Sequence, residues 1–191
     1  MNQTGNTILI TGGGSGIGEA LAHRFHDRGN TVIVAGRRRD ALESASAGRP
    51  NMHAIELDVE SAEGVANFTK RLLAQHPSVN MLVNNAGIMR FEMLDRSRDL
   101  TDAEQTINTN LLGPIRLIDA LVDHLAAQPN SAIVNVTSGL AFVPLFTTPT
   151  YNATKAAIHS YTLALREALK GRVEVIAVSY THLTLPTICS V

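Results

Sequence analysis

The sequence lacks the features that mark several specialised classes of protein. Its 191 residues include a single cysteine, Cys189, so the chain is not a disulfide-stabilised scaffold. It contains no run of about 18 apolar residues, the length that a membrane-spanning helix needs. Lys and Arg number 16 against 17 Asp and Glu, so the basic excess of a nucleic-acid-binding protein is missing. Since residues 1–6 also carry no charge, unlike a signal peptide, we expect a soluble, cytoplasmic protein without nucleic-acid or membrane partners.

Two hydrophobic patterns alternate along the chain. Short apolar runs typical of buried strands occupy residues 7–11, 31–35, 53–57, 81–83, 132–136 and 173–178. Runs with helical periodicity occupy residues 17–28, 40–47, 61–75, 101–127 (with an interruption near Gly113-Pro114) and 151–169. This alternation predicts an α/β fold with a doubly wound, Rossmann-like parallel sheet of strand order 3-2-1-4-5-6.

The turn after the first predicted strand is rich in glycine and reads TGGGSGIG. Gly12 can form the tight turn, Gly16 can let a pyrophosphate approach, and Gly18 can let the helix pack closely on the strand. Ser15 and Ile17 stand beside these glycines at the start of the helix, and we expect both to contact the same ligand. Such a turn can also be a tight loop without a ligand, but its place between the first strand and first helix predicts dinucleotide binding.

The end of the second predicted strand bears on the choice of cofactor. A carboxylate there would bind the ribose hydroxyls of NAD, whereas this chain has Arg37, Arg38 and Arg39. Guanidinium groups bind a phosphate dianion in a bidentate manner. We therefore expect NADP(H) to be favoured over NAD(H), with Arg37 and Arg38 as contacts. The alternative is a solvated basic start of a helix.

A tyrosine and a lysine stand four residues apart at the start of the helix predicted for residues 151–169. This spacing places Tyr151 and Lys155 on one face of the helix, one turn apart. A free phenol has a pKa of about 10, and a neighbouring ammonium group lowers it. A Tyr-x-x-x-Lys pair also occurs in many helices by chance, so it needs support from other motifs.

That support comes from a family resemblance across residues 7–178. Five motifs occur in the order of the short-chain dehydrogenase/reductase family: Thr11-Gly12-x-x-x-Gly16-x-Gly18, Asp58-Val59, Asn84-Asn85-Ala86-Gly87, Asn110-Leu111-Leu112-Gly113, and Ser138 followed by Tyr151-x-x-x-Lys155. The resemblance implies an enzyme that transfers a hydride between NADP(H) and a carbonyl or alcohol substrate. It also implies a homodimer or homotetramer, which would use the helices at 101–127 and 151–169.

The resemblance implies a role for each residue in these motifs. Tyr151 would be the general acid in reduction and the base in oxidation, and Lys155 would lower its pKa and bind the nicotinamide ribose. Ser138 would hold the substrate oxygen, and Asn110 would anchor a water that relays protons to Lys155. A further group would flank the adenine or line the cofactor cleft: Asp58, Val59, Asn84, Ala86 and Gly87.

Plainer interpretations exist for these residues. Asn84 could close its strand with turn hydrogen bonds, Ser138 could form an ordinary turn, and Asn110 could be a helix irregularity before Pro114. Two other function classes are a catalytically silent NADP(H)-binding sensor or scaffold and a methyltransferase. The intact set of catalytic residues argues against the first, and the arginines after the second strand argue against the second.

The sequence says less about metals and substrate. His23 and His26 stand three residues apart, but no carboxylate or cysteine completes a metal-binding set, so no metal is expected. The apolar segment Leu140–Phe146 borders the predicted site. It either lines an apolar substrate pocket or packs beneath that pocket.

The end of the chain departs from the family pattern. Members of the family continue after the sixth strand with a Pro-Gly turn, a substrate-covering segment, a helix and a seventh strand. Here residues 179–191 contain no Pro-Gly, and residues 178–187 can be encoded by the adapter of transposase-based sequencing libraries. We therefore expect residues 1–178 to form an incomplete Rossmann-like domain without the seventh strand and 179–191 to be non-native, which leaves little activity. The alternative is a genuine divergent tail that forms a short edge strand.

Overall fold

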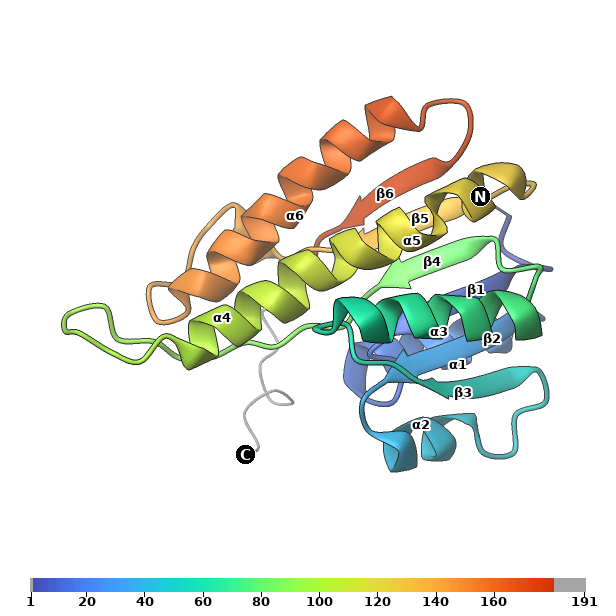
Figure 1. The fold of residues 1–191 in the computed structure, drawn as a ribbon, viewed down its shortest axis with the longest axis horizontal. Coiled ribbons are helices and arrows are strands. Elements are labelled where there is room, and N and C mark those ends of the chain that lie inside the picture. The colour runs from blue at the N-terminus through green and yellow to red at the C-terminus, as the bar shows by residue number, and fades with distance from the viewer. Residues whose placement is uncertain (1, 181–191) are drawn as a thin grey trace.

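The computed structural model describes residues 2–180, which contain a six-stranded sheet (Figure 1). The strands are β1 (Thr7–Thr11), β2 (Thr31–Gly36), β3 (Met52–Glu56), β4 (Met81–Asn84), β5 (Ala132–Val136) and β6 (Glu174–Val178). Their order is β3-β2-β1-β4-β5-β6, and every neighbouring pair is parallel. The predicted doubly wound topology is therefore confirmed, with strand boundaries within one residue of those predicted from the sequence.

The composition of each strand follows from its place in the sheet. Every residue of β1 and of β5 is buried, because helices cover the middle of a doubly wound sheet on both faces. At the β3 edge only Met52 and Ile55 are buried, and the other three residues face solvent. Continuous apolar runs thus mark the central strands, and mixed runs mark an edge.

Within residues 2–180, six α-helices surround the sheet. They are α1 (Gly16–His26), α2 (Arg39–Ser46), α3 (Ala62–Gln75), α4 (Thr101–Ile107), α5 (Gly113–Ala127) and α6 (Pro149–Ala168). On one face Phe68 of α3 and Leu121 of α5 pack in the same core as Leu9 and Ile133. Helices α1 and α2 cover the β1–β3 part of the opposite face, and Figure 1 shows α3, α5 and α6 together on the near side.

The predicted interruption near Gly113-Pro114 takes the form of a wider turn. Residues Asn108–Leu112 form a π-helical turn that joins α4 to α5, and Figure 1 shows the two helices as one rod. Pro114 lies in the first turn of α5, where its missing N–H and its ring would disturb a regular helix. The wider turn before it accommodates the proline without ending the rod. It also contains Asn110.

The C-terminal end of the described chain lies beside the loop after β5. The Thr137 amide donates to the Val178 carbonyl at 2.8 Å, and the Gly139 amide donates to the Tyr180 carbonyl at 3.1 Å. Most of the predicted non-native tail, from residue 181 on, lies outside the described residues, so that prediction stands untested. No helix within residues 2–180 has both the length and the apolar character to cross a membrane.

Candidate active site

The glycine-rich turn has a backbone geometry that suits only small residues. Gly12 and Gly16 adopt φ angles of +67° and +57°, in the left-handed region that L side chains rarely occupy. A Cβ on Gly18 would overlap the carbonyl oxygen of Gly12, so the helix packs against the turn only without a side chain there. The space beside Gly16 is open. An anion can therefore approach the backbone at Gly16, close to the start of α1.

Two residues outside the predicted site set hold this turn in place. The Thr11 hydroxyl accepts hydrogen bonds from the backbone amides of Asn85 and Ala86, both at 3.0 Å. The Asn85 side-chain amide donates to the Thr11 carbonyl at 3.0 Å. These bonds join the ends of β1 and β4. Both residues belong to the motifs quoted from the sequence, and their polar side chains at strand ends were the signal for such a role.

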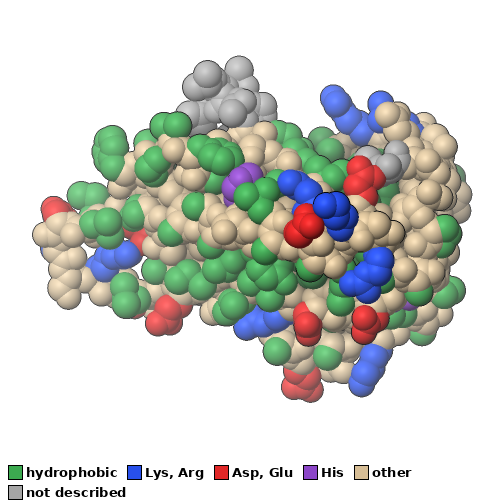
Figure 2. All heavy atoms as spheres, turned by 90° about the horizontal axis from the view of Figure 1, so that it is seen from above, with side chains coloured by type: hydrophobic (Ala, Val, Ile, Leu, Met, Phe, Trp, Pro, Cys, Tyr) green, Lys and Arg blue, Asp and Glu red, His purple; other side chains and the backbone are tan. Residues whose placement is uncertain are grey.

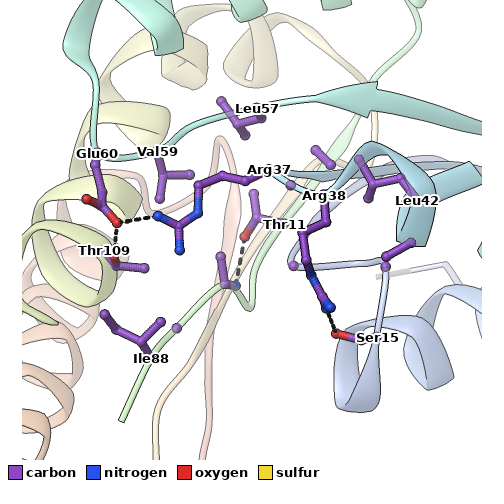
Figure 3. Close-up of a pocket in the computed structure, with 17 residues that line it drawn as sticks. Thr11, Ser15, Arg37, Arg38, Leu42, Leu57, Val59, Glu60, Ile88 and Thr109 are labelled. Atoms are coloured by element: carbon purple, nitrogen blue, oxygen red, sulfur yellow. Dashed lines mark hydrogen bonds and ion pairs between the residues drawn. The ribbon is translucent and has the colours of Figure 1, made fainter. Parts of the chain in front are cut away.

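A pocket of about 270 Å³ opens along the carboxyl ends of β1, β2 and β3 and the loop after β4 (Figure 3). Seven of the predicted cofactor contacts line it: Gly12, Ser15, Arg37, Arg38, Val59, Ala86 and Gly87. The other seven predicted contacts are outside the lining: Gly16, Ile17, Gly18, Asp58, Asn84, Tyr151 and Lys155. The lining also includes residues that the sequence analysis did not select, among them Leu42, Glu60, Ile88 and Thr109.

The arginines after β2 point in different directions. The Arg37 guanidinium lies 3.1 Å from the carboxylate of Glu60, which also accepts a 2.7 Å hydrogen bond from Thr109. The Arg38 guanidinium donates to the Ser15 hydroxyl at 3.0 Å. Figure 3 shows that the Arg37 and Arg38 side chains diverge, with Arg37 directed toward Glu60 and Arg38 toward Ser15. Arg39 pairs with Glu43 on α2 at 2.7 Å and does not line the pocket.

Two predicted cofactor contacts make other bonds. Asp58 is exposed, and its carboxylate accepts the Glu60 backbone amide at 3.0 Å. Asn84 is 4% exposed, and its amide donates to Asn135 at 2.9 Å. Asn135 in turn donates to the Thr162 hydroxyl of α6 at 2.9 Å. Asn84 thus belongs to a buried polar chain between the sheet and α6.

The Asn110 side chain makes two hydrogen bonds to the backbone of the loop that follows β4. Its oxygen accepts the Ile88 amide at 2.8 Å, and its nitrogen donates to the Ile88 carbonyl at 2.8 Å and to Thr154 at 3.3 Å. Lys155 is 4% exposed and donates to the Val136 carbonyl at 2.8 Å. A Cβ placed on Gly87 would lie 3.3 Å from the Asn110 oxygen and 3.6 Å from the Lys155 nitrogen. The pocket lining therefore reaches Asn110 and Lys155 at Gly87.

Tyr151 and Lys155 meet as the sequence spacing predicts, but burial controls their proton affinities. The Lys155 nitrogen lies 5.6 Å from the centre of the Tyr151 ring. Burial raises the pKa of Tyr151, and a hydrogen bond with Ser138 lowers it in part. Burial lowers the pKa of Lys155 to about 8. Burial of the phenol therefore sets the direction of the Tyr151 pKa, which is opposite to the lowering that the sequence predicts from Lys155.

The remaining predictions concern metals and the apolar segment. No cluster of three or more His, Cys, Asp or Glu side chains suited to a metal ion occurs among residues 2–180. His23 and His26 bind the carbonyls of Ala45 and Pro50. Within the Leu140–Phe146 segment, the ring centres of Phe142 and His159 are 4.8 Å apart. Phe142 is nevertheless 57% exposed, and Phe146 is 86% exposed. The segment therefore does not pack beneath the site.

Comparisons with known proteins agree with this geometry. A family model described as short chain dehydrogenase matches residues 6–185. The chain is 43% identical over 178 residues to the uncharacterized oxidoreductase DltE of Bacillus subtilis (strain 168), and the match covers 92% of this chain and 71% of that protein. The chain spans about half to about seven tenths of the length of the curated relatives it matches.

Two solved structures have closely similar folds. L-Sorbose reductase from Gluconobacter frateurii, complexed with NADPH and L-sorbose, matches with a TM-score of 0.86 at 27% identity, over 92% of this chain and 69% of that one. A 3-ketoacyl-(acyl-carrier-protein) reductase from Brucella melitensis, complexed with NADH, matches with a TM-score of 0.87 at 28% identity, over 93% and 76%. Since the family match spans almost all of the chain and the fold agrees with it, the protein belongs to the short-chain dehydrogenase/reductase family of oxidoreductases.

Proposed function

We propose that this oxidoreductase transfers a hydride between NADP(H) and a carbonyl or alcohol substrate, with Tyr151 as the general acid and base. The observation that carries the proposal is the junction at Gly87. There a Cβ placed on Gly87, which lines the same pocket as Arg37 and Arg38, would lie 3.6 Å from the Lys155 nitrogen. Tyr151 lies one turn before Lys155 on the same helix. A long ligand in the pocket could therefore place its far end beside a partly buried proton donor.

The residues of the pocket fit a dinucleotide. The open space beside Gly16 and the free N–H groups at the start of α1 suit a pyrophosphate. Val59 and Leu42 offer an apolar wall to the adenine ring, and Gly87 leaves room beside Lys155. The nicotinamide cofactor supplies the hydride, and the protein supplies orientation and charge.

The preference for NADP(H) rests on Arg37 and Arg38. Residues 37–39, directly after β2, contain no carboxylate, and Arg37 and Arg38 both line the pocket. Glu60 neutralises part of the charge of Arg37, which leaves Arg38, bound only to a serine hydroxyl, as the stronger anchor for a 2′-phosphate. One similar structure holds NADPH and another NADH, so the fold alone does not select the cofactor.

The chemistry follows from the proton affinities of the buried groups. Because burial raises its pKa, the Tyr151 phenol keeps its proton at neutral pH and can give it to a carbonyl oxygen as the hydride reaches the carbon. Ser138 hydrogen-bonds the phenol and can hold the same oxygen. Lys155, with a pKa of about 8, remains mostly charged at pH 7 and can bind a ribose hydroxyl. The Asn110 amide is already bound to Ile88 and Thr154, so we assign it the positioning of the loop after β4.

The substrate and assembly proposals rest on exposed apolar side chains. Phe91, Met93 and Phe146 are 60% or more exposed, in loops at the end of the molecule where α4 and α6 begin, and Figure 2 shows hydrophobic side chains at this end. They support an apolar carbonyl substrate. Ile107 and Leu163, also exposed, support a homodimer or homotetramer formed through α4 and α6. Light scattering of the purified chain measures the proposed oligomeric state. We also propose that the protein is cytoplasmic.

Titration and turnover together test the proposal. Binding of NADPH and of NADH is followed by cofactor fluorescence, and hydride transfer to a panel of ketones and aldehydes is followed by loss of NADPH absorbance with the protein in excess. We expect tighter binding of NADPH and transfer to apolar ketones. Binding without transfer to any carbonyl would favour the sensor or scaffold instead, and absence of binding would refute both.

A further inference from the structure

Glu92 is a buried acid outside the motifs that define the proposed site. It lies in the loop between β4 and α4 and is 6% exposed. Its carboxylate accepts the Thr150 backbone amide at 3.0 Å and the Thr150 hydroxyl at 2.7 Å. It also pairs with the Arg98 guanidinium at 2.6 Å, and its own amide donates to the Thr147 carbonyl at 2.9 Å. Four polar contacts therefore converge on one loop residue.

The carboxylate caps helix α6 from outside the helix. Thr148 stands at the N-cap position but makes no capping bond, and its hydroxyl donates to Asn152. Glu92 supplies the missing acceptor for a first-turn amide, and its negative charge suits the positive end of the helix dipole. Burial would raise the pKa of Glu92, but the bonds from Thr150 and Arg98 outweigh burial and hold this pKa below its ordinary value.

This cap lies next to the proposed proton donor. Thr150 directly precedes Tyr151, so the bonds from Glu92 fix the backbone one residue before the phenol. The same loop is held at its other end, where Asn110 clasps Ile88. The loop after β4 is thus fixed both to the rod of α4 and α5 and to the start of α6, on either side of the catalytic groups.

We propose that Glu92 is a positioning residue, which fixes the first turn of α6 and thereby places the Tyr151 phenol relative to Ser138 and Lys155. The effect on hydride transfer rests on the function proposed above, whereas the effect on the helix does not. Because a misplaced donor lowers a transfer rate much more than it lowers cofactor affinity, Glu92 should affect the transfer rate and leave the cofactor pocket alone.

The experiment compares four variants of the 191-residue chain with the parent. Glu92→Gln removes the charge, Thr150→Val removes only the hydroxyl bond to Glu92, and Thr150→Ser keeps that hydroxyl. Glu167→Gln is the matched control, the same substitution at an exposed position of α6. The measurements are amide hydrogen exchange of the first turn of α6, the NADPH dissociation constant, and single-turnover hydride transfer to a ketone.

We expect Glu92→Gln to accelerate exchange at the Thr150 amide by about tenfold or more and to slow hydride transfer by about tenfold or more, with the NADPH dissociation constant within about twofold. Thr150→Val should move both rates in the same direction, and Thr150→Ser and Glu167→Gln should behave like the parent.

Exchange and transfer unchanged in both Glu92→Gln and Thr150→Val would overturn the proposal, as would an equal loss of transfer and NADPH affinity. If Glu92→Gln does not fold, the comparison of Thr150→Val with Thr150→Ser decides. If the parent binds NADPH but transfers no hydride, the proposed function fails, and the exchange rates at α6 alone decide the role of Glu92.

Discussion

The two halves of the sheet's carboxyl edge differ in the solvent exposure of their polar side chains. At the ends of β1 and β2 the pocket lining includes glycine backbone and exposed side chains such as Arg37, whose side chain is 57% exposed. Around β5 and α6 the groups proposed for catalysis are enclosed, and Lys155 and Asn110 are 4% and 1% exposed. One half presents charge to solvent, and the other holds polar groups away from it.

This difference separates recognition from reactivity. A guanidinium in water keeps its charge at any physiological pH and can meet an anionic ligand without changing its own proton affinity. A buried phenol and a buried ammonium change theirs, because desolvation disfavours the charged form of each. Substitutions in the first half should therefore change affinity and cofactor choice, and those in the second half should change rate and stability.

The largest expected effect lies in the buried half. Tyr151→Phe should slow single-turnover hydride transfer by about a thousandfold or more, because the hydroxyl acts mainly in the transition state. The NADPH dissociation constant should stay within about twofold of the parent value, since the ring remains. Tyr161→Phe, on the same helix, is the control and should retain the parent rate. Transfer within a few-fold of the parent in Tyr151→Phe would mean that this tyrosine is structural.

The next largest effect should come from the exposed half. Arg38→Asp should lower the ratio of NADPH to NADH affinity by about ten- to a hundredfold, because a carboxylate repels the 2′-phosphate that this guanidinium, the stronger anchor proposed above, would bind. Hydride transfer from bound cofactor should change little.

Arg39→Asp is the matched control, because it makes the same change of charge at a residue that does not line the pocket and pairs with Glu43 instead. Its affinity ratio should stay near that of the parent. A parent chain that binds both cofactors equally, or equal effects of the two substitutions, would contradict the proposed phosphate site.

Local patterns in the sequence predict most of this fold and the exposed half of the site. Apolar runs separated by helical runs identify the strands and helices, and the glycine spacing identifies the turn, because both depend on residues close together in the chain. The strand order follows from these elements through the right-handed crossovers of a parallel sheet. Glu60 and Thr109 show what such patterns miss. They meet in the pocket across 49 positions, through packing that no local pattern records.

Strand periodicity contained one further signal. Leu82 and Asn84 of β4 are two residues apart and share a face of the sheet, and Leu82 packs in the core beneath α3 and α5. That alternation directs Asn84 toward Asn135 and α6, away from the pocket. The pKa of Tyr151 could not be obtained in this way, since its direction depends on how deeply the folded chain buries the phenol.

A third prediction concerns the energetic consequence of burying Lys155. Its pKa falls from 10.5 to about 8 on folding, so the unfolded chain binds more protons between these values and the free energy of unfolding rises with pH across that window. Below pH 8 the folded chain bears the full desolvation penalty, at most about 3 kcal/mol. Lys155→Met should therefore stabilise the chain by about 1–2 kcal/mol at pH 7, after loss of the bond to Val136.

Urea unfolding of the parent and of Lys155→Met at pH 7 and at pH 10.5 measures this effect. The advantage of the variant should shrink or vanish at the higher pH, and the variant should transfer no hydride at either. A variant less stable than the parent at pH 7 would show that the hydrogen bond to Val136 outweighs desolvation.

The smallest effect should be found where the exposed half meets helix α1. Ser15 is exposed at the N-cap position of α1 but makes no capping bond, and its hydroxyl accepts only the Arg38 guanidinium. Ser15→Ala should change the free energy of unfolding by less than about 0.5 kcal/mol. It should weaken NADPH binding by about two- to fivefold, because one hydrogen bond that orients Arg38 is lost. Ser15→Thr, which keeps the hydroxyl, is the control.

A loss of NADPH affinity larger than the loss of NADH affinity would mean that Ser15 acts through Arg38 on the 2′-phosphate. Equal losses would place its action at the pyrophosphate, and a clear loss of stability would show that it caps α1 after all.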